Sequence, residues 1–361
     1  MRLDARAFTV PTPEPEADGT LAWDATTAIV VLARAAGEIG TGWSYGPAAA
    51  ARVIDDLLAA EVAGCDPADL PAAAAAMAAA VRNAPRPGLA TIAISAVDAA
   101  LWDLKARITG VPLAALFGRA HERVPVYGSG GFTTYTDEQT REQLLGWVLG
   151  DGIPRVKIKI GEDRGRREER DVHRTELARD AVGAEVELFV DANGGYTAKQ
   201  AIRFAGRTEA LDVRWFEEPV SSDDLPGLAL VRSRVAPDVA AGEYGTDPRY
   251  FRLMCQAGAV DCLQVDATRC GGYTGFLACC AVADSFGLQV SAHCAPQLHA
   301  HVGVAVPNLR HLEWFADHVR VERLLFDGVL RPVGGLVAPD LGRTGNGLIL
   351  KDADAEPYRV A

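Results

Sequence analysis

From about Val124 onward, short apolar runs alternate with longer amphipathic segments. The runs predict strands, and most of them end at or next to a charged residue; they cover 124–131, 156–160, 188–191, 213–217, 263–266, 288–293 and 309–315, and Glu243 marks the end of one further strand between 217 and 263. The segments between them predict helices at 138–149, 167–182, 197–208, 224–234, 247–257, 272–286 and 297–305. Strands that are covered on both faces and alternate with helices indicate a parallel sheet.

The first part of the chain, residues 1 to about 122, shows a different order of elements. An apolar run at 29–32 predicts a strand, and the glycine-rich segment 37–46 predicts a hairpin with a loop. Helices are then predicted at 47–63, 72–82 and 92–109. Strands followed by helices are typical of an α+β domain.

The overall pattern predicts an α/β fold built on a TIM barrel. Eight strands, each followed by a helix, fit a closed barrel better than an open sheet, because no glycine-rich phosphate-binding loop follows a strand. We therefore divide the chain into an α+β domain (1–122), a barrel with the active site (123–325) and an irregular tail (326–361) that is rich in glycine and proline.

Seven charged side chains mark the ends of successive predicted barrel strands. They are separated by 20 to 32 residues, which is the length of one strand, one helix and two loops. The set is Lys159, Asp191, Glu217, Glu243, Asp266, His293 and Glu313. Because a parallel barrel gathers the carboxyl ends of its strands at one mouth, we expect these side chains to converge there.

Three of these groups, Asp191, Glu217 and Glu243, are carboxylates on consecutive strands. Three carboxylates that meet cannot all stay ionised unless a cation lies between them. Ligation by oxygen alone suits a hard divalent metal, and Mg²⁺ first. The alternative, three unrelated capping or ion-paired acids, fits each residue alone but not the three together at steps of 26 residues.

Lys157 and Lys159 lie two apart on one strand, so both face the same way, and we expect them to point into the barrel. A buried ammonium beside another cation has a lowered pKa and can act as a base. The alternative is an exposed edge strand with Ile158 and Ile160 as its core face.

His293 and Asp266 close neighbouring strands, and an aspartate behind an imidazole fixes its tautomer and raises its basicity. Glu313 could donate a hydrogen bond if protonated, or it could be an ion-pair partner. The other nearby histidines, His299, His301 and His311, are expected to be structural.

The composition of the chain limits the kinds of partner that it can bind. The net charge is −12 and no basic block stands out, which argues against nucleic acid and acidic membranes. We expect no apolar stretch long enough to span a bilayer, and the first residues lack the apolar core of a signal peptide. Seven cysteines without paired spacing predict reduced thiols in a cytoplasmic protein.

Several motifs resemble the mandelate racemase branch of the enolase superfamily, over most of the chain. They are Ser95–Lys105, the Lys-x-Lys strand Val156–Ile160, Asp191-Ala-Asn193, Phe216-Glu-Glu-Pro219, Gly242-Glu243, the pair Asp266 and His293, and Glu313. The resemblance implies a modified (β/α)7β barrel with a rearranged last helix. It also implies that the N-terminal domain and the C-terminal tail together cap the mouth.

The resemblance also implies roles for residues. Lys159 would be the base, with Lys157 as its neighbour, and Asp191, Glu217 and Glu243 would hold one Mg²⁺ per subunit. Loops at 10–23 and 42–46 would select the substrate. The candidate substrate contacts are Asn193, Glu218, Arg269, Trp43 and Tyr45.

Arg269 differs from the residue that some members of this family have at the same position, and this limits which members the chain resembles. Muconate cycloisomerases and dipeptide epimerases have a lysine base at the position that Arg269 resembles. Arginine holds its proton too tightly to act as a base, and His293 is present instead. This favours racemases and acid-sugar dehydratases.

We therefore expect a Mg²⁺-dependent lyase. It would abstract the α-proton of a sugar acid and eliminate water through an enediolate, giving a 2-keto-3-deoxy acid. A racemase or epimerase of a 2-hydroxy acid is the alternative. A silent binding protein and an unrelated barrel metallohydrolase are weaker alternatives. The expected partners are a small carboxylate and further copies of the chain.

Overall fold

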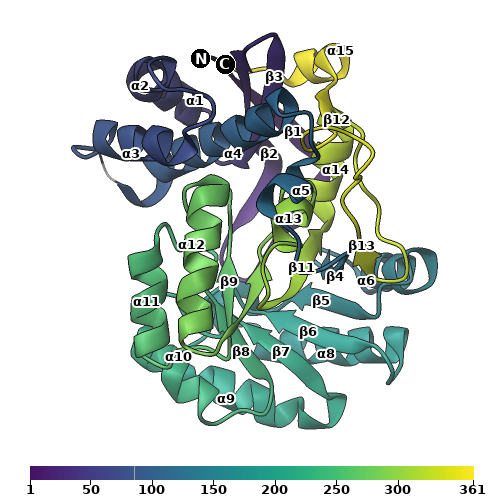
Figure 1. The fold of residues 1–361 in the computed structure, drawn as a ribbon. Helices are drawn as coiled ribbons and strands as arrows, with labels where there is room; N and C mark the ends of the chain where they lie inside the picture. Colours follow the sequence, from purple (N-terminus) through teal and green to yellow (C-terminus); the bar gives the residue numbers. More distant parts are fainter. Residues whose placement is uncertain (85) are drawn as a thin grey trace.

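The computed structural model describes residues 1–84 and 86–361. Within these residues, eight parallel strands form a sheet that closes on itself, because the last strand, β11, pairs with the first, β4. The strands follow one another round the barrel in chain order (Figure 1). They are β4 (Val124–Gly130), β5 (Arg155–Lys159), β6 (Glu187–Asp191), β7 (Val213–Glu217), β8 (Asp238–Ala241), β9 (Cys262–Val265), β10 (Gln289–Ala292) and β11 (Leu309–Phe315).

A helix follows each barrel strand in the described chain. They are α6 (Asp137–Leu145, continued by a π-type turn at Gly146–Gly150), α8 (Glu168–Val182, after the short α7, Glu162–Gly165), α9 (Ala198–Arg207), α10 (Leu225–Arg232), α11 (Pro248–Gln256), α12 (Gly272–Ser285), α13 (Pro296–Gly303) and α14 (Ala316–Leu325). With that turn included, α6 and the helices up to α13 begin and end within two residues of their predicted bounds. N-terminal capping explains where two of these helices begin: Thr136 forms a capping box with Gln139 before α6, and Thr197 forms one with Gln200 before α9.

The last helix, α14, is not among the helices predicted from the sequence. It begins directly after β11 and contacts both β4 of the barrel and β2 of the N-terminal sheet. The barrel is therefore modified at its last helix, which joins the barrel to its cap. The predicted α/β barrel with an α+β N-terminal domain is confirmed.

The interior of the barrel is filled below the mouth. Tyr127, Phe189, Trp215, Ala240 and Cys262 form a separate buried cluster there. His311 lies among these rings, with centroid separations of 4.7 Å to Tyr127 and 5.0 Å to Trp215. A hydrophobic floor therefore underlies the polar mouth, as in other barrels whose interior is a packed core.

The N-terminal sheet has the antiparallel order β1 (Arg2–Ala17), β2 (Ala22–Ala35), β3 (Glu38–Tyr45). The segment 10–23, predicted as a lid loop, is the end of the β1–β2 hairpin and its turn, and this turn does reach the barrel mouth. Prolines at 11, 13 and 15 suggest a loop, but β1 is an edge strand whose register shifts between Pro11 and Glu16. Proline is tolerated at edges and at bulges. The second predicted loop, at 42–46, is mostly β3.

Helices make up the rest of the N-terminal part, and the main one on the sheet is α4 (Thr91–Ile108), which packs on β2 and β3 (Figure 1). The helices are α1 (Ala49–Val53), α2 (Ala59–Ala63), joined to α1 by a π-type turn (Ile54–Leu58), α3 (Leu70–Ala80), α4 and the short α5 (Leu113–Phe117). Gly40 and Gly42 let β3 approach α4 so closely that a Cβ at either would lie 2.2 Å from helix backbone. The contact fixes β3, and with it Tyr45, over the barrel.

One helical segment of the described chain, Pro87–Ile108, is long and apolar enough to cross a membrane by length and composition. This differs from the expectation from the sequence. However, 67% of its apolar window is buried inside the protein, as in the core helix of a globular domain. Its contacts with β2, β3 and α12 account for that burial.

The C-terminal tail returns to both domains. Its strand β13 (Leu336–Val337) pairs with β4, and β12 (Phe326–Asp327) pairs with β14 (Ile349–Leu350). Near the end, α15 (Asp352–Ala355) meets the N-terminal sheet through an ion pair of 2.6 Å between Asp352 and Arg6. Asp103 of α4 accepts the backbone N–H groups of Thr41 at 2.7 Å and Asn346 at 2.5 Å, which ties β3, α4 and the tail together.

Candidate active site

The charged residues singled out in the sequence gather at the carboxyl ends of the barrel strands. Lys159, Asp191 and Glu217 are the last residues of β5, β6 and β7. Asp266 and His293 directly follow β9 and β10. The remaining two lie two residues beyond β8 (Glu243) and within β11 (Glu313).

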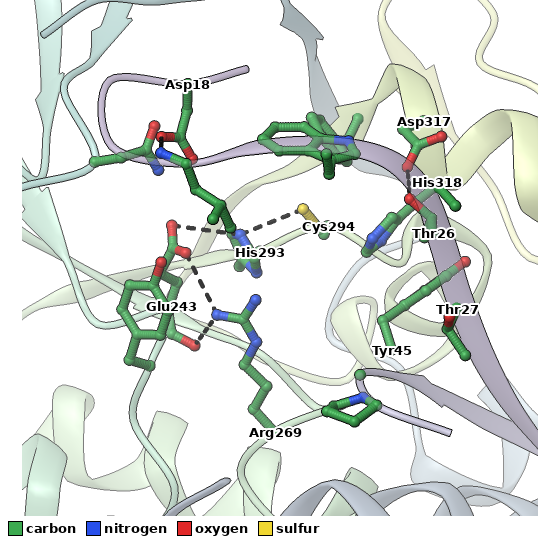
Figure 2. Close-up of a pocket in the computed structure, with 18 of the residues that line it drawn as sticks. Asp18, Thr26, Thr27, Tyr45, Glu243, Arg269, His293, Cys294, Asp317 and His318 are labelled. Atoms are coloured by element: carbon green, nitrogen blue, oxygen red, sulfur yellow. Dashed lines mark hydrogen bonds and ion pairs between the residues drawn. The ribbon is translucent and has the colours of Figure 1, made fainter. Parts of the chain in front are cut away.

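A cavity of about 420 Å³ opens at this mouth, between the barrel and the N-terminal sheet. Figure 2 shows Glu243, Arg269 and His293 on one side and Tyr45 and His318 on the opposite side. The full lining is Asp18, Leu21, Trp23, Ala25, Thr26, Thr27, Tyr45, Gly46, Pro47, Lys159, Asn193, Glu243, Tyr244, Arg269, His293, Cys294, Phe315, Asp317 and His318.

Asp191, Glu217 and Glu243 form a group that fits a divalent metal ion. One oxygen from each lies within 4.8 Å of the others, and all three side chains are buried. Glu243 Oε2 has no hydrogen-bond partner among the described residues. Burial and the neighbouring Asp191 raise the pKa of Glu217 well above its usual range. A cation between the carboxylates would offset the repulsion between their negative charges. Because all three ligands are hard oxygen atoms, Mg²⁺ is the cation that suits the site.

Both lysines of β5 lie inside the barrel and contact these acids. Lys157 is fully buried, contacts Glu217, and lies 2.8 Å from Glu313 Oε1 and 3.5 Å from Asp191 Oδ2. Lys159 contacts Asp191 and reaches the cavity.

The expected lowering of the lysine pKa is not seen in this arrangement. Burial lowers the pKa of both groups, but the surrounding carboxylates outweigh burial, and the pKa of each is raised. For Lys159 the main carboxylate is Asp191, and Lys157 opposes it with a second positive charge. Lys159 is therefore held as the counterion of Asp191.

His293 and Asp266 form a hydrogen-bonded pair. His293 Nδ1 lies 2.8 Å from Asp266 Oδ2, so the ring donates its Nδ1 proton to the carboxylate and keeps Nε2 for the cavity. The backbone N–H of Thr268 donates to Asp266 Oδ1 at 2.7 Å. Burial would raise the pKa of Asp266, but its contact with His293 outweighs burial and holds the pKa well below the usual range. Asp266 therefore stays ionised behind the ring.

Glu313 is an ion-pair partner in this structure. Its Oε1 accepts the Ser129 hydroxyl at 2.5 Å and faces Lys157, and its Oε2 accepts the backbone N–H of Cys294 at 3.0 Å. Burial raises its pKa, but Lys157 and His293 outweigh burial and hold the pKa well below its ordinary value. In each of these contacts Glu313 is the acceptor, which fits the ion-pair alternative.

Three of the predicted substrate contacts line the cavity. The side-chain Oδ1 of Asn193 has no hydrogen-bond partner among the described residues, while its backbone N–H donates to Asp191 Oδ1 at 2.8 Å. Arg269 donates to the Glu243 carbonyl at 3.0 Å. Tyr45 stacks on His318, with ring centroids 3.5 Å apart.

Trp43 and Glu218 lie outside this cavity. Trp43 is 1% exposed and packs on Phe326, with ring centroids 4.8 Å apart. It shares a face of β3 with Tyr45 but lies two residues farther from the cavity. Glu218 is buried beside the acid triad, and burial followed by the charge of Glu243 raises its pKa well above the usual range. We therefore expect neither side chain to touch the substrate directly.

Sequence reasoning missed part of the lining. Thr26 and Thr27 come from β2, Cys294 follows His293, and Asp317 and His318 lie in the first turn of α14. An additional helix placed directly after β11 could have drawn attention to Asp317 and His318. Nothing in the pattern of the sequence marks Thr26 or Thr27.

A capped parallel barrel with an acid triad, a lysine and a His–Asp pair at one mouth defines a class of metal-assisted enzymes that act beside a carboxylate. Two family models match the chain: "Mandelate racemase / muconate lactonizing enzyme, N-terminal domain" over residues 8–118 and "Enolase C-terminal domain-like" over residues 139–354. The chain belongs to the enolase superfamily, in its mandelate racemase / muconate lactonizing enzyme branch.

Individual relatives and solved structures support this family assignment. L-talarate/galactarate dehydratase of Salmonella typhimurium is 32% identical over 80% of this chain and 73% of its own. A mandelate racemase/muconate lactonizing enzyme-like protein from Rubrobacter xylanophilus is 49% identical, covers 99% of both chains and superposes with a TM-score of 0.96. A racemase from Streptomyces coelicolor, solved with bound magnesium, is 29% identical over 99% of both chains, with a TM-score of 0.92.

Proposed function

We propose that this enzyme is a Mg²⁺-dependent acid-sugar dehydratase. It would remove the proton α to a carboxylate and eliminate the β-hydroxyl as water, giving a 2-keto-3-deoxy acid. The observation that carries the proposal is that Lys159 and His293 line one cavity beside the carboxylates of Asp191, Glu217 and Glu243. The similarity to a dehydratase of sugar acids supports the choice of reaction.

The acid triad would hold Mg²⁺, which supplies positive charge that stabilises the negative charge developing on the substrate carboxylate. With Asp191 engaged as a metal ligand, Lys159 would lose its counterion, which would make its ammonium group easier to deprotonate. Lys159 then accepts the α-proton at Nζ. Lys157 stays paired with Glu313 and keeps the second positive charge beneath it.

His293 completes the elimination. Its Nε2 faces the cavity and donates a proton to the β-hydroxyl, so the β-carbon to oxygen bond breaks and the oxygen leaves as water. The electrons of the α C–H bond form the new double bond, and the enol product tautomerises to the 2-keto acid. Asp266 stabilises the imidazolium before the transfer and fixes the ring, through the Nδ1 contact of 2.8 Å.

The charges of the lining favour a substrate with one carboxylate. The permanent cations of the lining are Lys159, which the proposed reaction uses at the α-carbon, and Arg269, which donates to the Glu243 backbone carbonyl at 3.0 Å and lies 3.6 Å from Asp266. A carboxylate at the far end of a substrate would meet neither as a free cation. The proposed substrate is therefore an aldonic acid, with one acid group and several hydroxyls, in preference to a dicarboxylic aldaric acid.

The opposite wall is suited to hydroxyl groups. Thr26 donates to Asp317, which is also paired with Arg320 at 2.5 Å. Burial, with a further effect from the charge of His293, lowers the pKa of His318 to about 3, so its ring is neutral at pH 7. A neutral ring and hydroxyls exchange hydrogen bonds with a polyol without desolvating an unpaired charge.

Racemisation is the second candidate, and the same two groups favour it. If Lys159 and His293 face the α-carbon from opposite sides, a proton removed by one can be returned by the other. The solved racemase that resembles this chain supports that reading. The two reactions differ in what they require at the β-carbon of the substrate: elimination needs a hydroxyl group there, and racemisation does not.

The deciding experiment supplies a panel of aldonic and aldaric acids with Mg²⁺ and measures the 2-keto product, in water and in D₂O. We expect an aldonic acid to lose water, and Lys159→Ala and His293→Ala to abolish the product. The matched controls are Lys199→Ala and His173→Ala, which change the same residue types at exposed positions. If no sugar acid reacts while α-protons of an aromatic or N-acylated acid exchange, the dehydratase proposal is wrong.

A further inference from the structure

A second group of ligand atoms lies in the same mouth, made by His293, Cys294 and Glu313. Cys294 Sγ lies 3.3 Å from His293 Nε2 and 3.4 Å from Glu313 Oε2, and the nitrogen and the oxygen are 3.8 Å apart. Tetrahedral zinc, with bonds of about 2.0–2.3 Å, holds its ligand atoms roughly 3.3–3.8 Å from one another. The three atoms therefore already form a face of such a tetrahedron.

Each of these ligands is oriented by a partner on its far side. Asp266 accepts a hydrogen bond from the Nδ1–H group of His293, which leaves Nε2 with a free lone pair for a metal. Ser129 and Lys157 hold Oε1 of Glu313, so Oε2 is the atom turned to the cluster. Cys294 adopts a left-handed backbone conformation, with φ of 50°, and its side chain lines the cavity.

The second group of ligand atoms borders the acid triad at Glu243. Oε2 of Glu243, a residue only 3% exposed, has no hydrogen-bond partner among the described residues. It lies 3.4 Å from His293 Nε2, on the edge that the two ligand groups share. A cation bound at His293 would reduce the cost of keeping this carboxylate buried.

We propose that His293, Cys294 and Glu313 bind a thiophilic divalent cation of the Zn²⁺ class, at a site separate from the Mg²⁺ triad. A thiolate and an imidazole select zinc, whereas Mg²⁺ prefers oxygen ligands alone. On binding, the thiol proton of Cys294 passes to solvent, a sulfur–metal bond forms and the ring of His293 stays neutral. The fourth position faces the cavity and can take water.

The consequence for the enzyme is inhibition. A metal on Nε2 of His293 occupies the lone pair that the proposed reaction needs, so zinc and turnover exclude each other. The site itself depends only on the positions of three side chains. It therefore stands whichever reaction the enzyme catalyses, and it is tested by binding rather than by activity.

The test uses the full chain saturated with Mg²⁺ and adds Co²⁺, which reports sulfur ligation by a charge-transfer absorption band. We expect one Co²⁺ per chain with such a band, and bleaching of the band by Zn²⁺. Cys294→Ala should lose the band and bind Zn²⁺ at least about 100-fold more weakly. Cys65→Ala, which removes a free and more accessible thiol of the cap, should behave like the parent.

A second measurement on the unaltered protein guards against misfolding of the variant. Zn²⁺ should protect Cys294 from alkylation, as read by mass spectrometry of the peptide that contains it, while Cys65 stays reactive. The proposal is overturned if Mg²⁺-saturated protein binds neither metal, if Co²⁺ binds without a sulfur band, or if Zn²⁺ leaves the alkylation of Cys294 unchanged.

Discussion

Gly42→Ala tests the packing that holds the cap over the active site. Gly42 lies on β3, three residues before Tyr45 of the cavity wall, and β3 rests on α4 at this point. A Cβ at position 42 would lie 2.2 Å from the Ala100 backbone nitrogen and 2.5 Å from the Ala96 carbonyl oxygen. Neither atom can swing away, because both belong to the helix backbone.

The size of the effect follows from these distances. To bring the new methyl group to normal contact, β3 and α4 must separate by roughly 1 Å. Overpacking of a well-filled interior costs about 1–3 kcal/mol, and contacts with rigid backbone place this change at about 3 kcal/mol. The same displacement moves Tyr45 away from its stack on His318, so KM should rise along with the loss of stability.

The assay is the denaturant midpoint together with KM for the best substrate. Gly206→Ala is the matched control: Gly206 lies near the end of α9, and a Cβ there meets nothing within 4 Å. Alanine should stabilise that helix by about 0.5–1 kcal/mol. The reasoning is refuted if Gly42→Ala unfolds at the same midpoint as the parent, or if both variants lose equal stability.

Three further predictions concern charge. Mg²⁺ at 100 times its Kd should raise the free energy of unfolding by about 3 kcal/mol, and Glu217→Gln should remove most of this gain; equal stabilisation of both proteins in a denaturant titration with and without EDTA would contradict the triad. Asp266→Asn should lower kcat by about 100-fold or more and shift the pH–rate profile, because His293 loses its Nδ1 acceptor; an unchanged profile would argue against the pair. Burial raises the pKa of Glu322 from 4.5 to about 8, so between these pH values the native state keeps a proton that the unfolded chain releases. The contribution of this proton to the free energy of unfolding is complete below pH 4.5 and is lost as the pH rises through about 8. Glu322→Gln should therefore be more stable than the parent at pH 9 but not at pH 4, and midpoints that differ equally at both values would count against it.

The barrel and its charged mouth were predictable because both follow from period and spacing. Buried parallel strands read as apolar runs, and Lys159, Asp191 and Glu217 are the terminal residues of three of them. Convergence of the strand ends then needs no knowledge of side-chain conformation. The placement of Lys157 beneath Lys159 follows in the same way from the two-residue period of a strand.

The cap and the fine electrostatics were not predictable in the same way. The prolines made strand β1 difficult to predict. A segment with Pro11 resembles a loop in the sequence, and only the structure shows that it lies at the edge of a sheet, where proline is tolerated. Trp43 and Tyr45 share one face of β3, and only the placement of that strand on the barrel decides which of them reaches the cavity. The pKa of Lys159 depends on its contact with Asp191, which strand spacing does not specify.

The β1–β2 hairpin offers a part that could be exchanged for engineering. Its tip brings Asp18, Leu21 and Trp23 to the cavity, yet it carries none of the carboxylates of the triad and neither of the proton-transferring groups. Grafting the corresponding ribbon from a relative onto this barrel would alter which acids enter while leaving the bond-breaking chemistry in place. A short, hydrogen-bonded ribbon of this kind lets one scaffold diversify its repertoire without rebuilding its catalytic centre.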